Sequence, residues 1–255
     1  MIKVSKSSIS NYEINSVKKV LKNQYLGMGP EVEKFEKHLK KFFKRDVCCF
    51  NSGTAALQIA IQSCGLGKGD EILVPCITYV ATYQAISATG AKPVLCDIDP
   101  KNLNIDLNNL KKKITKKTKA IVPVHFTGYM TDMIKLKKIA KKYNLPIIED
   151  ACQSILASIN KKNAGTWGEF GAFSLHPLKN INVWSDGGII TTNNYKFYKH
   201  LKLLRNHGLA DRDTVKICGY NSRLDTFQAV VGNWLLPKAK QIANQRIKNA
   251  NYYDK

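Results

Sequence analysis

Short apolar runs alternate with helical patterns along most of this chain. The runs predict buried strands, and the stretches between several of them repeat apolar residues every three or four positions, as an amphipathic helix does. The predicted strands are residues 71–75, 93–96, 120–124, 146–149, 171–175 and 188–192, and the predicted helices between or after them are 79–89, 132–143 and 195–206. Strands linked through helices run parallel, and helices then cover the sheet. This order predicts an α/β fold with a mostly parallel central sheet sandwiched by helices.

Further helices frame the alternating region. Ser10 and Glu13 form a capping-box pattern ahead of a first helix, and Gly29-Pro30 precedes a second. An apolar helix is expected from Ala55 to about Cys64, and residues 225–243 are helical in pattern at the other end. No internal repeat or low-complexity linker interrupts the chain before about residue 235.

The charge balance is strongly basic. Forty Lys and Arg stand against 19 Asp and Glu in 255 residues, for a net charge of +21. Such an excess occurs in nucleic-acid-binding proteins. Here it is mostly lysine, at 111–119 and on a helical pattern at 135–142, with few aromatic residues between. We interpret it as a solvated surface and expect no nucleic-acid partner. A non-catalytic, nucleic-acid-binding protein is the alternative from another class.

Cysteine usage and hydropathy indicate the compartment. Seven cysteines, an odd number without a Cys-x-x-Cys pair, predict reduced thiols and no structural zinc. We expect several in the core, among them Cys76 and Cys96, which stand in apolar runs. The N-terminus lacks the apolar region of a secretory signal, and no apolar run approaches the roughly 20 residues that cross a bilayer. The sequence therefore predicts a cytoplasmic protein without membrane insertion or bound metal.

Ligands of open α/β sheets bind beyond the carboxyl ends of the strands, so polar residues that follow strands are candidates. Ser52-Gly53-Thr54 opens a helix, where free N–H groups and the helix dipole favour a phosphate, although an ordinary N-cap explains this motif better when it is taken alone. Asp150 ends a buried strand, where a carboxylate needs a partner such as a protonated ring nitrogen, a metal or an arginine; alone, a surface turn explains it as well. Lys179 follows another strand and could form a Schiff base, but alone it is one lysine among many.

Together these residues meet four needs of pyridoxal phosphate (PLP): a cradle for the phosphate, an aromatic on the ring, a carboxylate for the ring nitrogen and a lysine for the aldehyde. They follow in the order Ser52–Thr54, Tyr79, Asp150, Lys179. Longer motifs surround them, namely Asn51-Ser-Gly-Thr-Ala-Ala-Leu57, Thr78-Tyr-Val-Ala-Thr82, Glu149-Asp-Ala-Cys-Gln-Ser154, Phe173-Ser-Leu-His-Pro-Leu-Lys179 and Gly219-Tyr-Asn-Ser-Arg223. By these motifs the chain resembles the DegT/DnrJ-type sugar aminotransferases, which are fold-type I PLP enzymes.

The resemblance implies how the cofactor would be held. Gly53 and Thr54 match the turn that cradles the phosphate, and Ser174 matches a second phosphate ligand. Tyr79 matches the aromatic residue that stacks on the pyridine ring, and Gln153 matches a residue beside the ring hydroxyl.

The resemblance also implies the catalytic residues and a dimer. Asp150 matches the carboxylate that keeps the ring nitrogen protonated, and Lys179 matches the lysine that binds the cofactor covalently and moves the proton. Asn221 matches a residue that reaches the phosphate from the neighbouring subunit, which implies a homodimer with shared sites.

The reaction implied is transfer of an amino group from an amino-acid donor, glutamate by resemblance, to a keto sugar that is nucleotide-linked, in cell-surface polysaccharide or amino-sugar biosynthesis. The segment 180–188, Asn-Ile-Asn-Val-Trp-Ser-Asp-Gly-Gly, is more similar to members that act on 3-keto sugars or an oxidised octulosonate than to members that act on 4-keto sugars. One alternative is a dehydratase relative that uses the pyridoxamine form, whose members carry His in place of Lys179. Another is a truncated, non-catalytic member.

Members of this family continue into a small C-terminal domain that helps to close the site. We expect residues 1–235 to form the PLP-binding large domain and residues 236–255 to be the start of a truncated small domain. On this expectation the chain binds PLP but aminates sugars poorly, and the apolar side of the helix from Asp225 lacks the partner against which it normally packs.

Overall fold

The computed structural model describes residues 9–23 and 25–254. Its central sheet is built from β1 (Asp46–Phe50), β2 (Glu71–Pro75), β3 (Lys92–Cys96), β4 (Thr118–Ile121), β5 (Ile148–Asp150), β8 (Phe170–Ser174) and β9 (Gly188–Thr192). The strands form two groups, in the orders β3-β2-β4 and β5-β8-β9-β1, and single parallel bridges from Ile121 to Ile147 and from Val124 to Asp150 join them. Among the described residues of this sheet, β9 is antiparallel to both of its neighbours, and the other strand pairs are parallel. The prediction of a mostly parallel sheet is confirmed.

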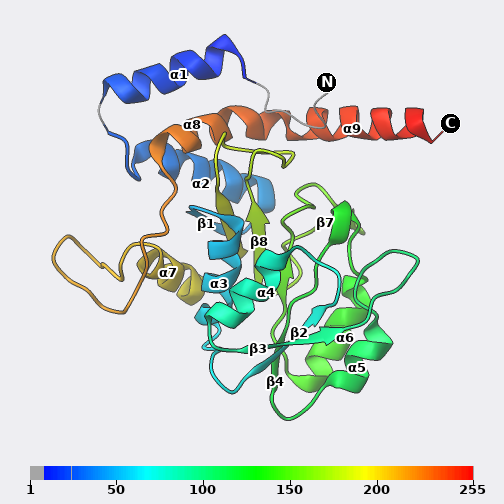
Figure 1. Cartoon of the computed structure of the whole chain (residues 1–255). Helices are drawn as coiled ribbons and strands as arrows, with labels where there is room; N and C mark the ends of the chain where they lie inside the picture. Colours follow the sequence, from blue (N-terminus) through cyan, green and yellow to red (C-terminus); the bar gives the residue numbers. More distant parts are fainter. Residues whose placement is uncertain (1–8, 24, 255) are drawn as a thin grey trace.

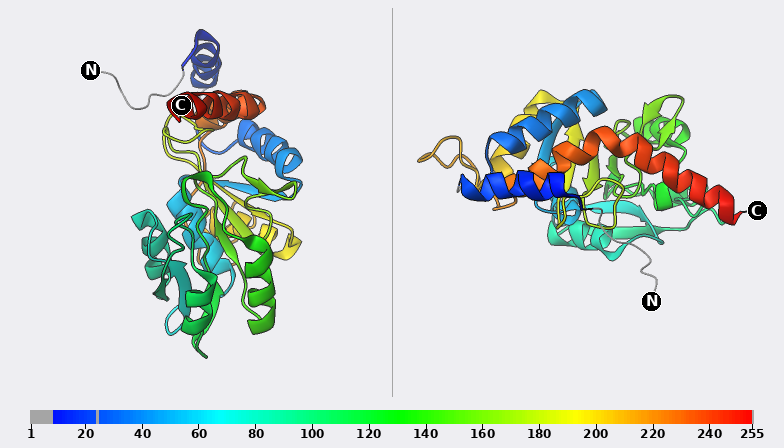
Figure 2. Two further views of the ribbon diagram at one scale, coloured as in Figure 1. Left: turned by 90° about the vertical axis from the view of Figure 1, so that its right-hand side faces the viewer. Right: turned by 90° about the horizontal axis from the view of Figure 1, so that it is seen from above.

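Helices cover both faces of the sheet (Figures 1 and 2). The apolar side chains of α3 (Gly53–Ser63), α4 (Val80–Ala88) and α7 (Tyr195–Leu204) share one core cluster with one face of the strands. Those of α2 (Pro30–Phe43), α5 (Leu107–Lys113) and α6 (Met133–Tyr143) share a second cluster with the other face. Neighbouring strand residues divide between the clusters: Cys48 and Ile190 belong to the first, and Cys49 and Ile189 to the second. This is the alternation that a strand buried on both faces requires.

The remaining helices lie across one end of the sheet. These are α1 (Asn11–Lys22), α8 (Thr226–Leu235) and α9 (Ala239–Tyr253), which extends past the body of the molecule (Figure 1). Helix α8 packs closely on α2, because Gly232 leaves room for the ring of Phe35, and its Trp234 stacks on Tyr12 of α1 with 6.3 Å between ring centroids. The main body of the chain thus covers the apolar side of this helix, through α1 and α2.

Several boundaries differ from the sequence prediction. Strand β1 and helix α5 were not predicted. Each is short, and the charged or apolar residues next to it obscure the alternation of apolar and polar residues that would reveal a strand or a helix. The helical pattern at 225–243 is split: Pro237, which has no N–H to donate, lies in a 3₁₀ turn (Leu236–Lys238) between α8 and α9. The strand predicted at 120–124 is β4, at 118–121.

The cysteines and lysines bear on the predicted character of the surface. All seven cysteines are free thiols; Cys96 is buried as expected, whereas Cys76 is exposed, so its assignment to the core was wrong.

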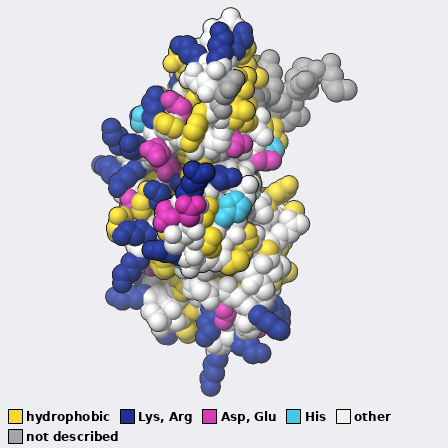
Figure 3. All heavy atoms as spheres, turned by 90° about the vertical axis from the view of Figure 1, so that its left-hand side faces the viewer, with side chains coloured by type: hydrophobic (Ala, Val, Ile, Leu, Met, Phe, Trp, Pro, Cys, Tyr) yellow, Lys and Arg dark blue, Asp and Glu magenta, His cyan; other side chains and the backbone are white. Residues whose placement is uncertain are grey.

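The predicted surface lysines on α5, on α6 and near the start of β4 are exposed. On the face drawn in Figure 3, Lys and Arg are spread along the whole molecule and do not gather in one patch. Among the residues that the structure describes, no helix combines the length and apolarity needed to span a bilayer.

A buried ion pair fixes β1 against its two covering helices. Glu36 of α2 is 8% exposed, and Arg205, which follows α7, is 3% exposed. Arg205 donates to Glu36 and to the carbonyl of Cys49 (2.9 Å), while the N–H of Cys49 donates to Glu36 (2.8 Å). Burial alone would lower the pKa of Arg205, but the carboxylate of Glu36 outweighs it and raises that pKa above the usual value.

We expect Glu36→Gln to lower the free energy of unfolding by about 3–5 kcal/mol, because it leaves the guanidinium of Arg205 buried without its counter-charge. Lys135→Gln is the control: it removes the exposed ion pair with Asp132 (3.1 Å) and should change stability by less than about 1 kcal/mol. Urea denaturation followed by circular dichroism measures both. Equal effects of the two variants would contradict the importance assigned to the buried pair.

Candidate active site

The N-terminus of α3 meets the ends of two strands. Phe50 of β1 and Ser174 of β8 both lie opposite Gly188, the first residue of β9. A Cβ on Gly188 would lie 2.1 Å from the carbonyl oxygen of Ser52, and a Cβ on Gly53 would lie 2.8 Å from the Cβ of Ser174. Both positions therefore need glycine for the backbones to approach this closely.

Ser52 caps α3 and leaves donors free. Its hydroxyl oxygen accepts from the N–H of Ala55 (3.1 Å). Within the described part of the chain, the N–H groups of Gly53 and Thr54 have no hydrogen-bond acceptor. Two unpaired N–H groups at the positive end of a helix dipole are a favourable place for an anion.

Lys179 stands in a loop that is anchored at both ends to Leu175, the residue after β8. The N–H of Leu175 donates to the carbonyl of Gly187 (2.8 Å), and the carbonyl of Leu175 accepts from the N–H of Val183 (3.1 Å). The N–H of Lys179 donates to the carbonyl of His176 (2.8 Å) in the turn that begins the loop. The backbone below the Lys179 side chain is thus held in place.

Asp150 ends β5 as a buried carboxylate, 6% exposed. One oxygen accepts from the hydroxyl of Thr82 on α4 (2.7 Å), and the other from the N–H of Cys152 (3.1 Å). Among the described residues, no Lys, Arg or His lies within ion-pair distance of it. A buried carboxylate with only neutral donors can still take a cationic partner.

Cys152 connects Asp150 to the lysine. Burial first, and then the charge and hydrogen bonding of Asp150, raise the pKa of its thiol well above the usual value, while the charge of Lys179 lowers it only in part. The thiol therefore stays protonated at neutral pH and is a poor nucleophile. Cys152 lines the same cavity as Lys179 and does not compete with it for an electrophile.

A cavity of about 260 Å³ opens beside the lysine. Its polar lining includes Gln153, Ser174 and Lys179, and Gln153 is oriented by accepting from the N–H of Thr127 (2.7 Å). The structure thus brings five of the predicted residues to one end of the sheet: Gly53 against Ser174, Gln153 and Lys179 in the cavity wall, and Asp150 behind Cys152. Thr54 is the next residue along α3 and is half-buried.

Like Gly53, Thr54 and Asp150, the predicted residues Tyr79 and Asn221 are not part of the cavity lining. Tyr79 is 71% exposed, at the N-cap of α4, and its carbonyl accepts from the N–H of Thr82 (3.0 Å). Asn221 is exposed and accepts from Arg223 (3.1 Å). The N–H of Asn51, just before the turn at Ser52, donates to the carbonyl of Ser222 (3.1 Å), and the hydroxyl of Ser222 donates to the side-chain oxygen of Asn51 (2.9 Å).

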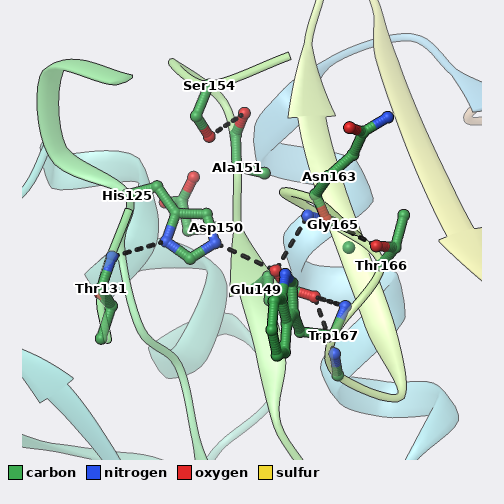
Figure 4. Close-up of polar contacts among 12 residues, drawn as sticks. His125, Thr131, Glu149, Asp150, Ala151, Ser154, Asn163, Gly165, Thr166 and Trp167 are labelled. Atoms are coloured by element: carbon green, nitrogen blue, oxygen red, sulfur yellow. Dashed lines mark hydrogen bonds and ion pairs between the residues drawn. The ribbon is translucent and has the colours of Figure 1, made fainter. Parts of the chain in front are cut away.

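Directly before Asp150, Glu149 forms a network that sequence reasoning missed (Figure 4). Glu149 is fully buried and accepts four hydrogen bonds: from His125 (3.0 Å) and from the N–H groups of Gly165 (2.8 Å), Trp167 (2.6 Å) and Gly168 (2.7 Å). Adjacent strand residues point to opposite sides, so Glu149 and Asp150 serve different surroundings. The network therefore lies beside the cavity wall and is not part of it.

The protonation of His125 follows from its other nitrogen. Nδ1 lies 3.3 Å from the N–H of Thr131, which can only donate, so Nδ1 is an acceptor and carries no proton. The proton is on Nε2 and points to Glu149. The ring is thus a neutral donor to Glu149.

Arg45 closes the same loop from the other side. It is buried and donates to the carbonyls of Gly165 (3.0 Å), Gly168 (2.9 Å) and Glu169 (3.3 Å). Burial lowers the pKa of Arg45, and Glu149 and Glu169 partly restore it. The loop before β8 is therefore held by its N–H groups on Glu149 and by its carbonyls on Arg45.

Comparison with known proteins identifies the family. Residues 7–255 match the DegT/DnrJ/EryC1/StrS aminotransferase family. The chain belongs to this family. It is 39% identical over 243 residues to UDP-2-acetamido-2-deoxy-3-oxo-D-glucuronate aminotransferase of Pseudomonas aeruginosa, with 93% of this chain and 67% of the relative covered.

Solved structures agree with the family assignment. DesV of Streptomyces venezuelae, solved with a ketimine intermediate, matches with a TM-score of 0.86 at 34% identity, covering 90% of this chain and 62% of DesV. Spr1654 of Streptococcus pneumoniae in its PLP form matches with a TM-score of 0.93 at 26% identity, covering 99% of this chain and 70% of Spr1654. Family and neighbours together indicate PLP as the cofactor and confirm the fold-type I assignment.

The chain spans between 55% and 67% of the length of the curated relatives that it matches. What it covers includes the whole central sheet and every candidate site residue. The sequence motifs thus led to the right family. They did not assign a role to Thr82, Glu149 or Arg45. Of these three, only Thr82 could have been placed near the site from the sequence, because it follows Tyr79 by three positions and so lies on the same side of a helix.

We expect Glu149→Gln to cost about 3–5 kcal/mol of unfolding free energy. The amide has one acceptor oxygen in place of two and would turn an NH₂ group toward backbone N–H donors. Glu169→Gln, on an exposed residue of the same loop, should stay within about 0.5 kcal/mol. Thermal and urea unfolding of both variants test this, and a Glu149→Gln protein as stable as the parent would refute the role given to the network.

Proposed function

We propose that this chain forms the cofactor-binding part of a PLP-dependent aminotransferase that moves an amino group from an amino acid to a nucleotide-linked keto sugar. The observation that carries the proposal is the position of Lys179 in the wall of a cavity that it shares with Cys152, whose N–H donates to the buried Asp150. A lysine and an unpaired buried carboxylate at one end of an α/β sheet suit the aldehyde and the ring nitrogen of the cofactor.

The donor set suits the other parts of PLP as well. The free N–H groups of Gly53 and Thr54 would bind the phosphate, with Ser174 beside them. Tyr79, exposed at the start of α4, would lie against the ring, and Gln153 would contact the ring hydroxyl. When bound, PLP supplies an electron sink for the carbon that carries the amino group.

The side chains then divide the chemistry. Asp150, held by Thr82 and by the N–H of Cys152, keeps a proton on the ring nitrogen because its negative charge favours the protonated form. Lys179 holds the cofactor and moves a proton at its Nζ between donor and acceptor positions. The protonated thiol of Cys152 keeps a competing nucleophile out of the site.

The amino donor we propose is glutamate, and the acceptor is a 3-keto sugar on a nucleotide. The relative from Pseudomonas aeruginosa is named for a 3-oxo sugar nucleotide, and segment 180–188 of this chain resembles such members. The pathway we propose is amino-sugar or cell-surface polysaccharide biosynthesis; one relative in Bacillus subtilis is named a spore coat polysaccharide biosynthesis protein. We place the reaction in the cytoplasm.

A domain boundary near residue 235 and a homodimer complete the proposal. Residues 1–235 include the sheet and the site, whereas the described residues from Leu236 on form the turn and α9, which beyond Ala239 is largely exposed. Asn221 is exposed and lies outside the cavity wall of its own chain, which fits a residue offered to the phosphate of a neighbouring subunit.

Lys179→Ala should lower transamination by roughly a thousandfold or more, because covalent attachment of PLP and the proton shuttle are both lost. The absorbance of the bound cofactor should change with it. Lys196→Ala, on an exposed lysine of α7, should leave both unchanged. Turnover of the Lys179→Ala protein near that of the parent would remove the lysine from the mechanism and favour the non-catalytic alternative.

Asn221→Ala and Lys179→Ala should each be inactive alone and active when mixed. Random re-pairing gives hybrid dimers with one intact site each, so activity should return to about a quarter of the parent value. The measurement is turnover after the two proteins are co-refolded. If the mixture stays inactive, or the active parent is a monomer by light scattering, Asn221 does not act across a dimer.

A further inference from the structure

Thr82 connects the two groups that the cofactor ring would meet, Tyr79 and Asp150, and it lies outside the lining of the Lys179 cavity. It is in the first turn of α4 and is 1% exposed. Its N–H donates to the carbonyl of Tyr79 (3.0 Å), and its hydroxyl oxygen lies 2.7 Å from Asp150 and 2.9 Å from the hydroxyl of Thr78. One buried residue is therefore bonded both to the turn that carries Tyr79 and to the carboxylate.

The direction of these side-chain hydrogen bonds follows from the protons that are present. An ionised carboxylate can only accept, so the single hydroxyl proton of Thr82 points to Asp150. The oxygen of Thr82 then offers only lone pairs to Thr78, so the Thr78 hydroxyl is the donor in that contact. A hydrogen-bonded chain thus runs from Thr78 through Thr82 to Asp150. In such a chain each bond strengthens the next, and donation to the carboxylate favours its charged form.

Thr82 holds the Asp150 side chain from a distant part of the sequence. The backbone of Asp150 is fixed by its bonds to Pro123 (2.9 Å) and His125 (3.0 Å), which leave the carboxylate free to rotate. The N–H of Cys152 binds one oxygen, but it belongs to the turn that Asp150 itself begins. Within the described part of the chain, the Thr82 bond alone ties this carboxylate to another helix, across 68 positions. The bond therefore decides how the carboxylate is oriented relative to α4.

We propose that Thr82 is a positioning residue, which sets the carboxylate of Asp150 relative to the Tyr79 turn so that one group meets the nitrogen and the other the face of the same ring. The inference rests on the proposed function, since that ring is the pyridine ring of PLP. Thr78 acts only through Thr82, and neither hydroxyl takes part in the covalent chemistry.

The test compares PLP-loaded variants by two measurements: the nitrogen NMR resonance of isotope-labelled PLP, which reports protonation of the ring nitrogen, and the dissociation constant of PLP. Thr82→Val removes the hydroxyl. It should shift the resonance toward that of an unprotonated ring and weaken PLP binding roughly tenfold. Thr82→Ser keeps the hydroxyl and should restore both values. Thr89→Val is the matched control, because the hydroxyl of Thr89, at the other end of α4, donates to the carbonyl of Ile86 (2.7 Å); it should change neither.

Thr78→Val tests the order of the chain. It should weaken PLP binding by about threefold, since Thr82 keeps its own bond to Asp150. The double variant of Thr78 and Thr82 should bind PLP as weakly as Thr82→Val alone, because Thr78 reaches the carboxylate only through Thr82. Additive losses in the double variant would contradict this order.

The remaining outcomes separate the inference from the proposed function. An unchanged nitrogen resonance in Thr82→Val, or no recovery in Thr82→Ser, overturns the positioning role; if Thr82→Val does not fold, an unchanged resonance in Thr78→Val overturns it. A parent chain that binds no PLP contradicts the proposed function instead. Hydrogen exchange of the Cys152 amide in the cofactor-free chain then decides. A carboxylate freed from Thr82 holds that N–H less well, so exchange should be several-fold faster in Thr82→Val than in Thr82→Ser, and equal rates overturn the inference.

Discussion

The site depends on one buried charge, the carboxylate of Glu149. A carboxylate without solvent costs several kcal/mol unless its lone pairs are all engaged, so the chain must bring donors to it. Three of the four are N–H groups of the loop at 165–168, which can reach Glu149 only when that loop is closed. The loop leads directly into β8, and the end of β8 carries the loop of Lys179. Satisfying one charge in the interior thus sets the position of the lysine.

The fourth donor to Glu149 is the neutral ring of His125, and Asp150, the next residue of β5, shows why this matters. Glu149 and Asp150 are consecutive carboxylates on a three-residue strand, directed to opposite sides. His125 adds a donor to Glu149 without adding a positive charge, since its other nitrogen accepts from Thr131. The charge of Glu149 interacts with the buried guanidinium of Arg45, whereas Asp150 has no ion-pair partner among the described residues. The carboxylate of Asp150 can therefore favour a cation next to it, which is the condition that a protonated ring nitrogen needs.

Local patterns were enough to predict most of the sheet and the residues around the cavity, and not enough to predict what holds them. β2 and β9 were found with their true boundaries because a buried strand is a short apolar run with sharp ends. The partnership of Thr82 with Asp150 spans 68 positions of sequence, and no periodicity records such a contact. Cys76 shows the converse: an apolar neighbourhood predicted burial, but the residue follows the end of β2, where the sheet opens to solvent. Contacts made by the folded chain, and not segment propensity, decide these cases.

The place of β9 in the sheet constrains the order in which the molecule can form during synthesis. β9 lies between β1, made some 140 residues earlier, and β8, and it pairs antiparallel with both. Gly188 packs on the carbonyl of Ser52, and Ser222 then bonds to Asn51. A nascent chain consequently carries the start of α3 without its supports until the segment after Lys179 has left the ribosome. Pairing of strands that are far apart in the sequence makes folding slow, and until it happens the edges of the earlier strands stay unpaired. Assembly of this end of the sheet therefore requires the chain to be synthesised at least through β9.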